Sequence, residues 1–181
     1  MSIPFSDRLQ RVETSAIREL FKLLGKPGII SFAGGFPDSA MFDVEGIRLA
    51  SEAALRDQPG AALQYGATEG HTPLREALAQ HMVAKGVKGI SAQDLIVTTG
   101  SQQALDLLGK TLMQSGDTVL VEAPTFLATI QCFRLYGPTV KGVAVDDQGV
   151  DVDALEAAIL EHRPKAIYLI PTFGNPSGAM M

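Results

Sequence analysis

Cysteine is nearly absent from the sequence: Cys132 is its only one. A single cysteine excludes an internal disulfide and is typical of a reducing compartment, so we expect a cytoplasmic protein. The sequence also has no apolar run long enough to span a bilayer, so no membrane partner is expected. Residues 1–11 contain no apolar core followed by a small-residue cleavage site, so no signal peptide is predicted.

An excess of basic residues is missing too. The formal net charge is −5, which argues against nucleic acid as a partner because binding phosphates needs a basic face. The three histidines, His71, His81 and His162, form no pair at helical ligand spacing, so no metal site is predicted. Ser101 has no neighbouring histidine or acidic motif that would indicate a nucleophile triad.

The composition is that of a globular protein, with 46% apolar and 19% charged residues. Strand and helix patterns alternate regularly from residue 95 onward, which predicts an α/β fold with a parallel sheet, right-handed crossovers and helices on both faces. The predicted strands are residues 29–32, 95–99, 118–121, 140–145 and 166–170. The predicted helices are residues 15–24, 43–57, 72–85, 101–114, 125–136 and 152–162. Residues 1–40 are expected to form an arm or small-domain segment, and residues 41–181 the first part of the α/β domain.

The most informative motif is the turn Pro171-Thr-Phe-Gly-Asn-Pro-Ser-Gly178, which follows the predicted strand 166–170. Open α/β sheets bind their ligands just past the carboxyl ends of their strands. Pro176 restricts the backbone before it, and Gly178 lets the chain reverse. The side-chain amide of Asn175 is thereby presented as a hydrogen-bond donor and acceptor.

A second junction, Thr98-Thr-Gly-Ser-Gln-Gln103, joins a predicted strand to a predicted helix. Gly100 permits a tight turn, and the N–H groups that begin a helix bind phosphate with help from the helix dipole. The Ser101 hydroxyl adds a donor. Taken alone, this junction is a weak signal that favours an ordinary capped helix which binds nothing.

Together these strings resemble the fold-type I aminotransferases that use pyridoxal 5'-phosphate (PLP), of class I/II. Ile96 to Asp106 resembles their phosphate cup, which implies that Gly100, Ser101 and Gln102 bind the cofactor phosphate. Glu122-Ala-Pro-Thr-Phe126 resembles their Pro-x-aromatic turn, where Phe126 replaces a frequent tyrosine, keeping the ring stacking and losing the hydroxyl. The asparagine matching Asn175 hydrogen-bonds the phenolic oxygen of the cofactor in that family.

Two further strings extend the resemblance toward the N-terminus. Leu63 to Gly70 contains Tyr65, which matches a tyrosine that reaches the phosphate of the partner subunit and so implies a homodimer. Ser31 to Pro37 resembles a loop beside the substrate carboxylate, with Gly35 as a substrate-binding residue. Taken alone, Tyr65 is equally a buried tyrosine with a local hydrogen bond, and Gly35 equally part of a plain turn. These two strings look closest to the 2-aminoadipate/kynurenine-like branch.

The resemblance implies transfer of an amino group from an amino acid to a 2-oxo acid. None of the seven lysines has the sequence context of the family's Schiff-base lysine, so no catalytic residue is assigned. In the family, that lysine, the acid at the pyridine nitrogen and the arginine for the substrate carboxylate lie beyond the position matching Met181. We therefore expect this chain to be an N-terminal portion that is inactive by itself and has the C-terminal half of the same fold as its partner.

Three alternatives stay open. The same fold supports PLP-dependent β-lyases and decarboxylases. A second alternative is a non-catalytic PLP-binding module of a transcriptional regulator. We expect no DNA-binding segment before residue 31, and this argues against that alternative. A third is an α/β fragment that binds no cofactor.

Overall fold

The computed structural model describes residues 3–11 and 37–181. The chain divides into two compact units, one of Met1–Thr14 with Thr99–Met181 and the other of Ser15–Thr98. The predicted helix 15–24 and strand 29–32 lie outside the described residues. The domain boundary expected between residues 40 and 41 stays a prediction. Within the described part of the chain, no helix is long and apolar enough to cross a membrane.

The described part of the second unit is helical. Its elements are η2 (Ser39–Met41), α2 (Val44–Asp57), α3 (Pro59–Leu63), α4 (Thr72–Ala84) and η3 (Ala92–Asp94). The N–H of Gly46 donates to Asp43 Oδ1 over 2.8 Å, so α2 begins where the sequence predicts. Pro59 begins α3, because the first turn of a helix needs no N–H at that position.

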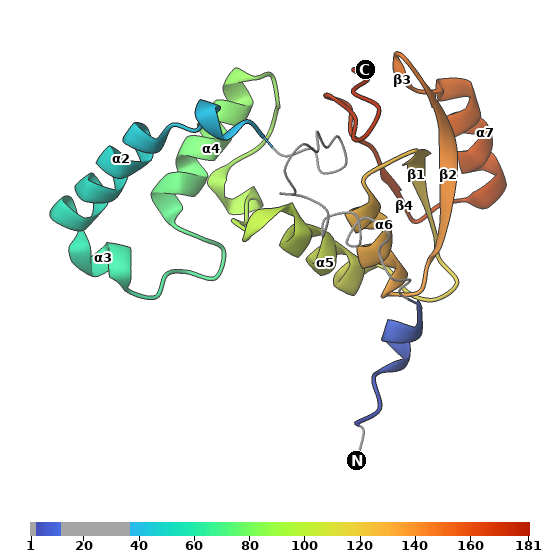
Figure 1. The fold of residues 1–181 in the computed structure, drawn as a ribbon, viewed down its shortest axis with the longest axis horizontal. Coiled ribbons are helices and arrows are strands. Elements are labelled where there is room, and N and C mark those ends of the chain that lie inside the picture. The colour runs from blue at the N-terminus through green and yellow to red at the C-terminus, as the bar shows by residue number, and fades with distance from the viewer. Residues whose placement is uncertain (1–2, 12–36) are drawn as a thin grey trace, which may run out of the picture. The chain divides into compact units, whose positions relative to one another are not determined.

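The first unit holds the sheet, shown in Figure 1. Its strands are β1 (Thr118–Ala123), β2 (Thr139–Asp146), β3 (Gly149–Val150) and β4 (Ala166–Tyr168), in the order β3-β2-β1-β4. β1 pairs in parallel with β2 and β4, whereas β3 pairs antiparallel with β2. The sheet is thus mostly parallel, as predicted. The short strand β3 was not among the predicted strands.

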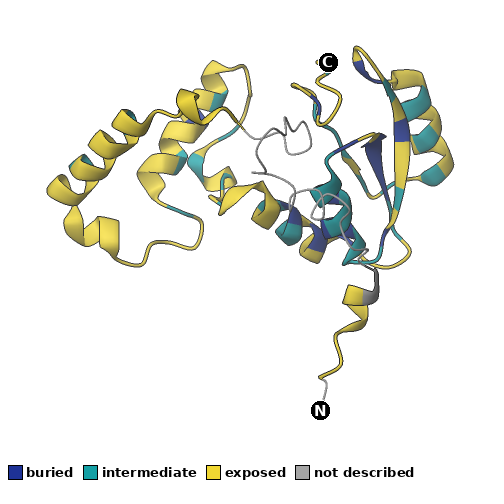
Figure 2. Cartoon of the chain, viewed as in Figure 1, coloured by how far each residue is buried: buried dark blue, intermediate teal, exposed yellow. Residues whose placement is uncertain are grey.

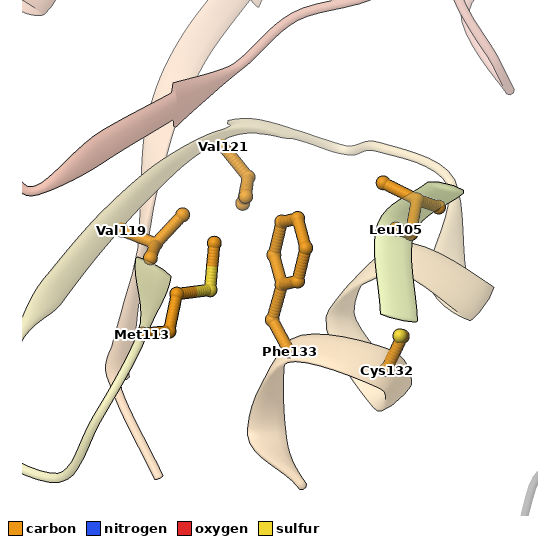
Figure 3. Close-up of a cluster of buried hydrophobic side chains, with 6 residues drawn as sticks. All are labelled: Leu105, Met113, Val119, Val121, Cys132 and Phe133. Carbon is orange, nitrogen blue, oxygen red and sulfur yellow. The ribbon is translucent and has the colours of Figure 1, made fainter. Parts of the chain in front are cut away.

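Helices cover both faces of this sheet. α5 (Gly100–Leu112) and α6 (Leu127–Arg134) pack on one face, and α7 (Val152–His162) packs on the other. Side chains alternate along β1, so Val119 and Val121 meet α5 and α6 while Leu120 meets α7. Figure 3 shows the first of these clusters, in which Phe133 lies among Leu105, Met113, Val119, Val121 and Cys132. A short 3-10 helix, η1 (Asp7–Arg11), belongs to the same unit.

One predicted strand is wrong. Residues 95–98 form no helix or strand, and Val97 N–H donates to the carbonyl of Glu69 over 2.8 Å. Apolar β-branched residues favour a strand, but a strand forms only beside another strand, and none of the strands in the described residues pairs with this segment. The helix expected at 125–136 is shorter, at Leu127–Arg134, and the strand expected at 166–170 ends at Tyr168.

Candidate functional site

Three predicted segments meet at one edge of the sheet in the first unit. β1 and β4 run in parallel, so the turns that contain Phe126 and Asn175 both leave the same edge. α5 ends at Leu112, shortly before β1 begins, so it runs back along the sheet and starts at that edge. The first turn of α5, Phe126 and Asn175 therefore come from three segments at the carboxyl edge, where α/β sheets bind their ligands.

The start of α5 suits an anion. Gly100 has φ of 77°, a conformation that glycine adopts without strain and that turns the chain into the helix. Asp43 and Asp151 cap α2 and α7 with their carboxylates, whereas the N-cap Thr99 of α5 makes no side-chain cap bond and its first turn has no acid. The N–H groups that begin a helix lack partners within it and carry the positive end of its dipole, so this end favours negative charge.

Ser101 and Gln102 lie in that first turn, and both are exposed. The turn is braced from within, because the N–H of Thr99 donates to Gln103 Oε1 over 2.5 Å. Gln103 was quoted in the sequence motif but given no role. Ser101 and Gln102 are the other polar side chains of this first turn.

The turn after β1 contains a half-buried Phe126, which is the N-cap of α6. Glu122, the last residue but one of β1, is almost fully buried, and Ile170 N–H donates to its Oε2 over 3.1 Å. This bond ties the end of β1 to the chain just before Pro171. The hydroxyls of Thr125 and Thr129 are buried without a hydrogen-bond partner among the described residues. Buried hydroxyls of this kind are completed by water or by a ligand.

The turn that carries Asn175 is closed by its own backbone. Gly174 N–H donates to Ala179 O over 2.8 Å, and Met181 N–H donates to Pro171 O over 2.9 Å. Gly178 has φ of 75°, which confirms the predicted chain reversal. Asn175 is exposed, and its bond to Pro176 is cis. The side-chain amide of Asn175 therefore stands on a closed loop beside the carboxyl edge of the sheet.

The structure gives no position relative to this edge for two of the predicted residues. Tyr65 belongs to the other unit, where its side chain is 98% exposed and its N–H donates to Gln64 Oε1 over 2.8 Å. Gly35 lies outside the described residues. Among the described residues no group of three or more histidine, cysteine or acidic side chains could hold a metal ion.

A polar contact between α5 and the end of α6 was missed by sequence reasoning. The hydroxyl of Tyr136 donates to Asp106, 30 residues away, and this bond raises the pKa of Tyr136 to about 12, with burial adding to the effect. The same bond, followed by the one from Lys110, lowers the pKa of the Asp106 carboxyl. Burial raises the pKa of the Cys132 thiol on α6, and the Gln102 side chain, one turn earlier than Asp106 on α5, lowers it in part. No sequence signal links residues so far apart.

The first unit is thus a mostly parallel α/β sheet in which the start of α5 and the turns of Phe126 and Asn175 share the carboxyl edge, where such sheets bind ligands. The family model described as aminotransferase class I and II matches residues 29–181, and the chain belongs to this family. The resemblance and the fold class inferred from the sequence are thereby confirmed.

Known relatives agree with this assignment. The 2-aminoadipate transaminase of Thermus thermophilus is 45% identical over 94% of this chain and 41% of its own length. The aromatic-amino-acid aminotransferase 1 of Thermococcus litoralis is 43% identical over 98% of this chain and 44% of its own length. The crystal structure of the α-aminoadipate aminotransferase LysN from T. thermophilus, complexed with N-(5'-phosphopyridoxyl)-L-leucine, matches with a TM-score of 0.83 and 43% identity over 97% of this chain and 42% of that one. The chain thus spans less than half the length of these relatives.

Proposed function

We propose that this chain forms the phosphate and ring side of the cofactor site in a PLP-dependent aminotransferase. The complete protein transfers an amino group from an amino acid to a 2-oxo acid. The observation that carries the proposal is that α5 starts at the same sheet edge as Phe126 and Asn175, with no acid in its first turn and no cap bond from the Thr99 side chain. The phosphopyridoxyl adduct carried by the similar LysN structure supports the choice of cofactor.

The donor set fits this cofactor. Ser101 and Gln102, with the N–H groups of the first turn of α5, would hold the phosphate. The Asn175 amide would donate to the phenolic oxygen, and Phe126 would cover one face of the ring by stacking alone, since it has no hydroxyl. PLP, when bound, supplies a conjugated ring that withdraws electrons from the α-carbon of an amino acid.

The residues of this chain bind and orient the cofactor and the substrate, and none of them transfers a proton. Glu122 holds Ile170 and so fixes where the Asn175 turn leaves the sheet. Tyr65 serves the phosphate of a neighbouring subunit in a homodimer, and Gly35 lies beside the substrate carboxylate. The lysine, the acid and the arginine that the chemistry needs come from the complementary C-terminal half. The cytoplasmic location stays a prediction that rests on the single cysteine.

Cofactor titration of the complete gene product tests the site. Asn175→Ala removes a hydrogen bond to a charged oxygen, worth roughly 1.5–3 kcal/mol, so PLP binds more weakly and the pH profile of its absorption shifts. Thr172→Ala, an exposed position in the same turn, is the matched control and leaves both unchanged. Unchanged affinity and spectrum in Asn175→Ala would mean that Asn175 is only a turn residue.

Product analysis separates transamination from the lyase and decarboxylase alternatives. A transaminase converts the amino acid to a 2-oxo acid only when an acceptor 2-oxo acid is present, and it releases neither free ammonia nor carbon dioxide. The 181-residue polypeptide alone is expected to show no turnover. After borohydride reduction with PLP, peptide mapping should find no lysine labelled stoichiometrically. One such labelled lysine together with amino transfer would contradict this expectation.

A further inference from the structure

The helix that offers its start to an anion is held against its neighbour by one stripe of side chains. Gln102, Asp106 and Gly109 recur every three or four residues, so they lie on one face of α5. The Gln102 side chain lies close enough to Cys132 to lower its pKa, and Asp106 accepts a hydrogen bond from Tyr136. The first of these contacts lies at the candidate site, and the second lies one helical turn below it.

Gly109, the third residue of this stripe, lets the Tyr136 ring pack closely against α5. A Cβ atom at Gly109 would come within 2.4 Å of Cδ2 of the Tyr136 ring, so only glycine lets the ring lie flat against α5. The guanidinium of Arg8, from η1, lies 5.9 Å from the centroid of the same ring. Tyr136 is therefore held by ring contacts, while its hydroxyl is directed to the carboxylate of Asp106.

A hydrogen bond to a carboxylate is directional as well as strong. Ring contacts with Gly109 set how closely α5 approaches α6. They leave open how far α5 slides along its axis or rotates about it. A bond from a fixed phenol to Asp106 restricts both movements. Because Gln102 precedes Asp106 by one helical turn, a restriction at Asp106 also fixes the first turn of α5.

We propose that Tyr136 and Asp106 are positioning residues for the anion site: their hydrogen bond holds α5 at the depth and rotation at which Ser101 and Gln102 bind a phosphate group. This inference rests on the proposed function, because it assumes that a phosphate binds at the start of α5. Neither residue touches the phosphate, and each acts through the helix.

The experiment measures phosphate preference in the complete gene product. Dissociation constants for PLP, pyridoxal and inorganic phosphate are compared in the wild type, Tyr136→Phe, Asp106→Asn, Ser101→Ala and Tyr168→Phe. Tyr136→Phe keeps the ring against Gly109 and removes only the hydroxyl. Tyr168→Phe is the matched control, because it removes a phenol packed on the same core cluster, for which no bond to a carboxylate is found among the described residues. Circular dichroism checks that each variant is folded.

We expect Tyr136→Phe to raise the dissociation constants of PLP and inorganic phosphate by about three- to tenfold, which is part of the effect of one hydrogen bond to a charged group. The dissociation constant of pyridoxal should change by less than about twofold. Asp106→Asn, which keeps the shape but loses the charge, gives the same pattern at a smaller size. If Tyr136→Phe does not fold, the dissociation constants of Asp106→Asn alone test the positioning role. A purely structural role would weaken PLP and pyridoxal equally.

Two results overturn the inference and are distinguishable. If Ser101→Ala lowers the preference for PLP over pyridoxal while Tyr136→Phe and Asp106→Asn leave that preference unchanged, the positioning role is wrong and the proposed phosphate site stands. If Ser101→Ala also leaves the preference unchanged, the phosphate does not bind at α5, and both the proposed site and the inference fail.

Discussion

The two units differ sharply in how many of their side chains are buried. In the unit that holds the sheet, Val119, Leu120 and Thr129 are fully buried and two apolar clusters form. In the described part of the other unit, Ala79 is the only buried residue, while α2 and α3 leave Val44 and Leu63 more than 70% exposed. Figure 2 shows the contrast, with buried positions gathered around the sheet. Helices alone do not make a core: α2 and α4 are as well formed as α5, but no sheet among the described residues covers their apolar faces.

Hydrogen exchange gives the largest expected contrast. In the 181-residue polypeptide, amides of β1 should exchange more slowly than those of residues 95–98 and of α2 by roughly two orders of magnitude or more, because exchange follows local burial. The measurement is exchange mass spectrometry with sedimentation on the same sample. A monodisperse monomer with equally strong protection at 95–98 would show that this segment pairs with a strand.

The same leucine-to-alanine change should have very different effects in the two units. Leu120→Ala removes a fully buried side chain and is expected to lower the free energy of unfolding by about 2–5 kcal/mol. Leu63→Ala, at a position 78% exposed, should change it by less than about 0.5 kcal/mol. Tyr136 and Tyr168 report on the sheet unit by tyrosine fluorescence, since the sequence has no tryptophan. A cost for Leu63→Ala matching that of Leu120→Ala would mean that α3 is buried in solution.

Alanine substitutions at two helical glycines should change the free energy of unfolding in opposite directions. Gly109→Ala puts a Cβ 2.4 Å from the Tyr136 ring and should destabilise the sheet unit by roughly 1–3 kcal/mol, as overpacking does. Gly60→Ala in α3 has nothing within 4 Å, so it should stabilise that helix by about 0.5–1 kcal/mol through helix propensity. Denaturant unfolding measures both variants. Equal effects of the two substitutions would contradict the packing seen between α5 and the end of α6.

The smallest expected effect is the pH dependence that the Asp106–Tyr136 pair contributes to the stability of the sheet unit. The pKa of Tyr136 is raised to about 12, above an unfolded value of about 10, so its contribution is complete below about pH 10 and is lost as pH rises toward 12. The pKa of Asp106 is lowered, so its contribution is lost in acid, below its unfolded value of about 3.9.

Ultraviolet titration checks the first of these statements. In a Tyr65→Phe/Tyr168→Phe background, Tyr136 is the only phenol left to titrate. Adding Asp106→Asn should bring its pKa down toward roughly 10, while Arg8, Lys110 and Cys132 still face the pair. A titration that Asp106→Asn does not move would contradict the hydrogen bond.

Local signals in the sequence were sufficient for much of this structure. The helix at Val152–His162 and the starts of α2 and α4 follow from an acidic cap or a first-turn proline, and they are confirmed. The turn glycines at 100 and 178 have the positive φ that their motifs require. These features depend on a few neighbouring residues, which a sequence displays directly.

What the sequence could not predict depends on distant partners. Residues 95–98 have strand composition, but whether they form a strand depends on a partner that composition does not reveal. Glu122 looks like a strand-end acid, and only the fold brings Ile170 N–H to it, 48 residues away. The Asp106–Tyr136 bond was missed for the same reason. The roles of Ser101, Gln102, Phe126, Asn175, Tyr65 and Gly35 toward a cofactor stay predictions.

The closed loop from Pro171 to Met181 bears on the cost of binding. Its shape is set by backbone bonds from Gly174 to Ala179 and from Met181 to Pro171. The backbone around Asn175 therefore loses most of its conformational entropy when the chain folds, before any ligand arrives. An amide on such a loop is preorganised, and a ligand that accepts its hydrogen bond need not order the loop as well. A looser loop bearing the same asparagine would bind the same group less tightly, with no contact removed.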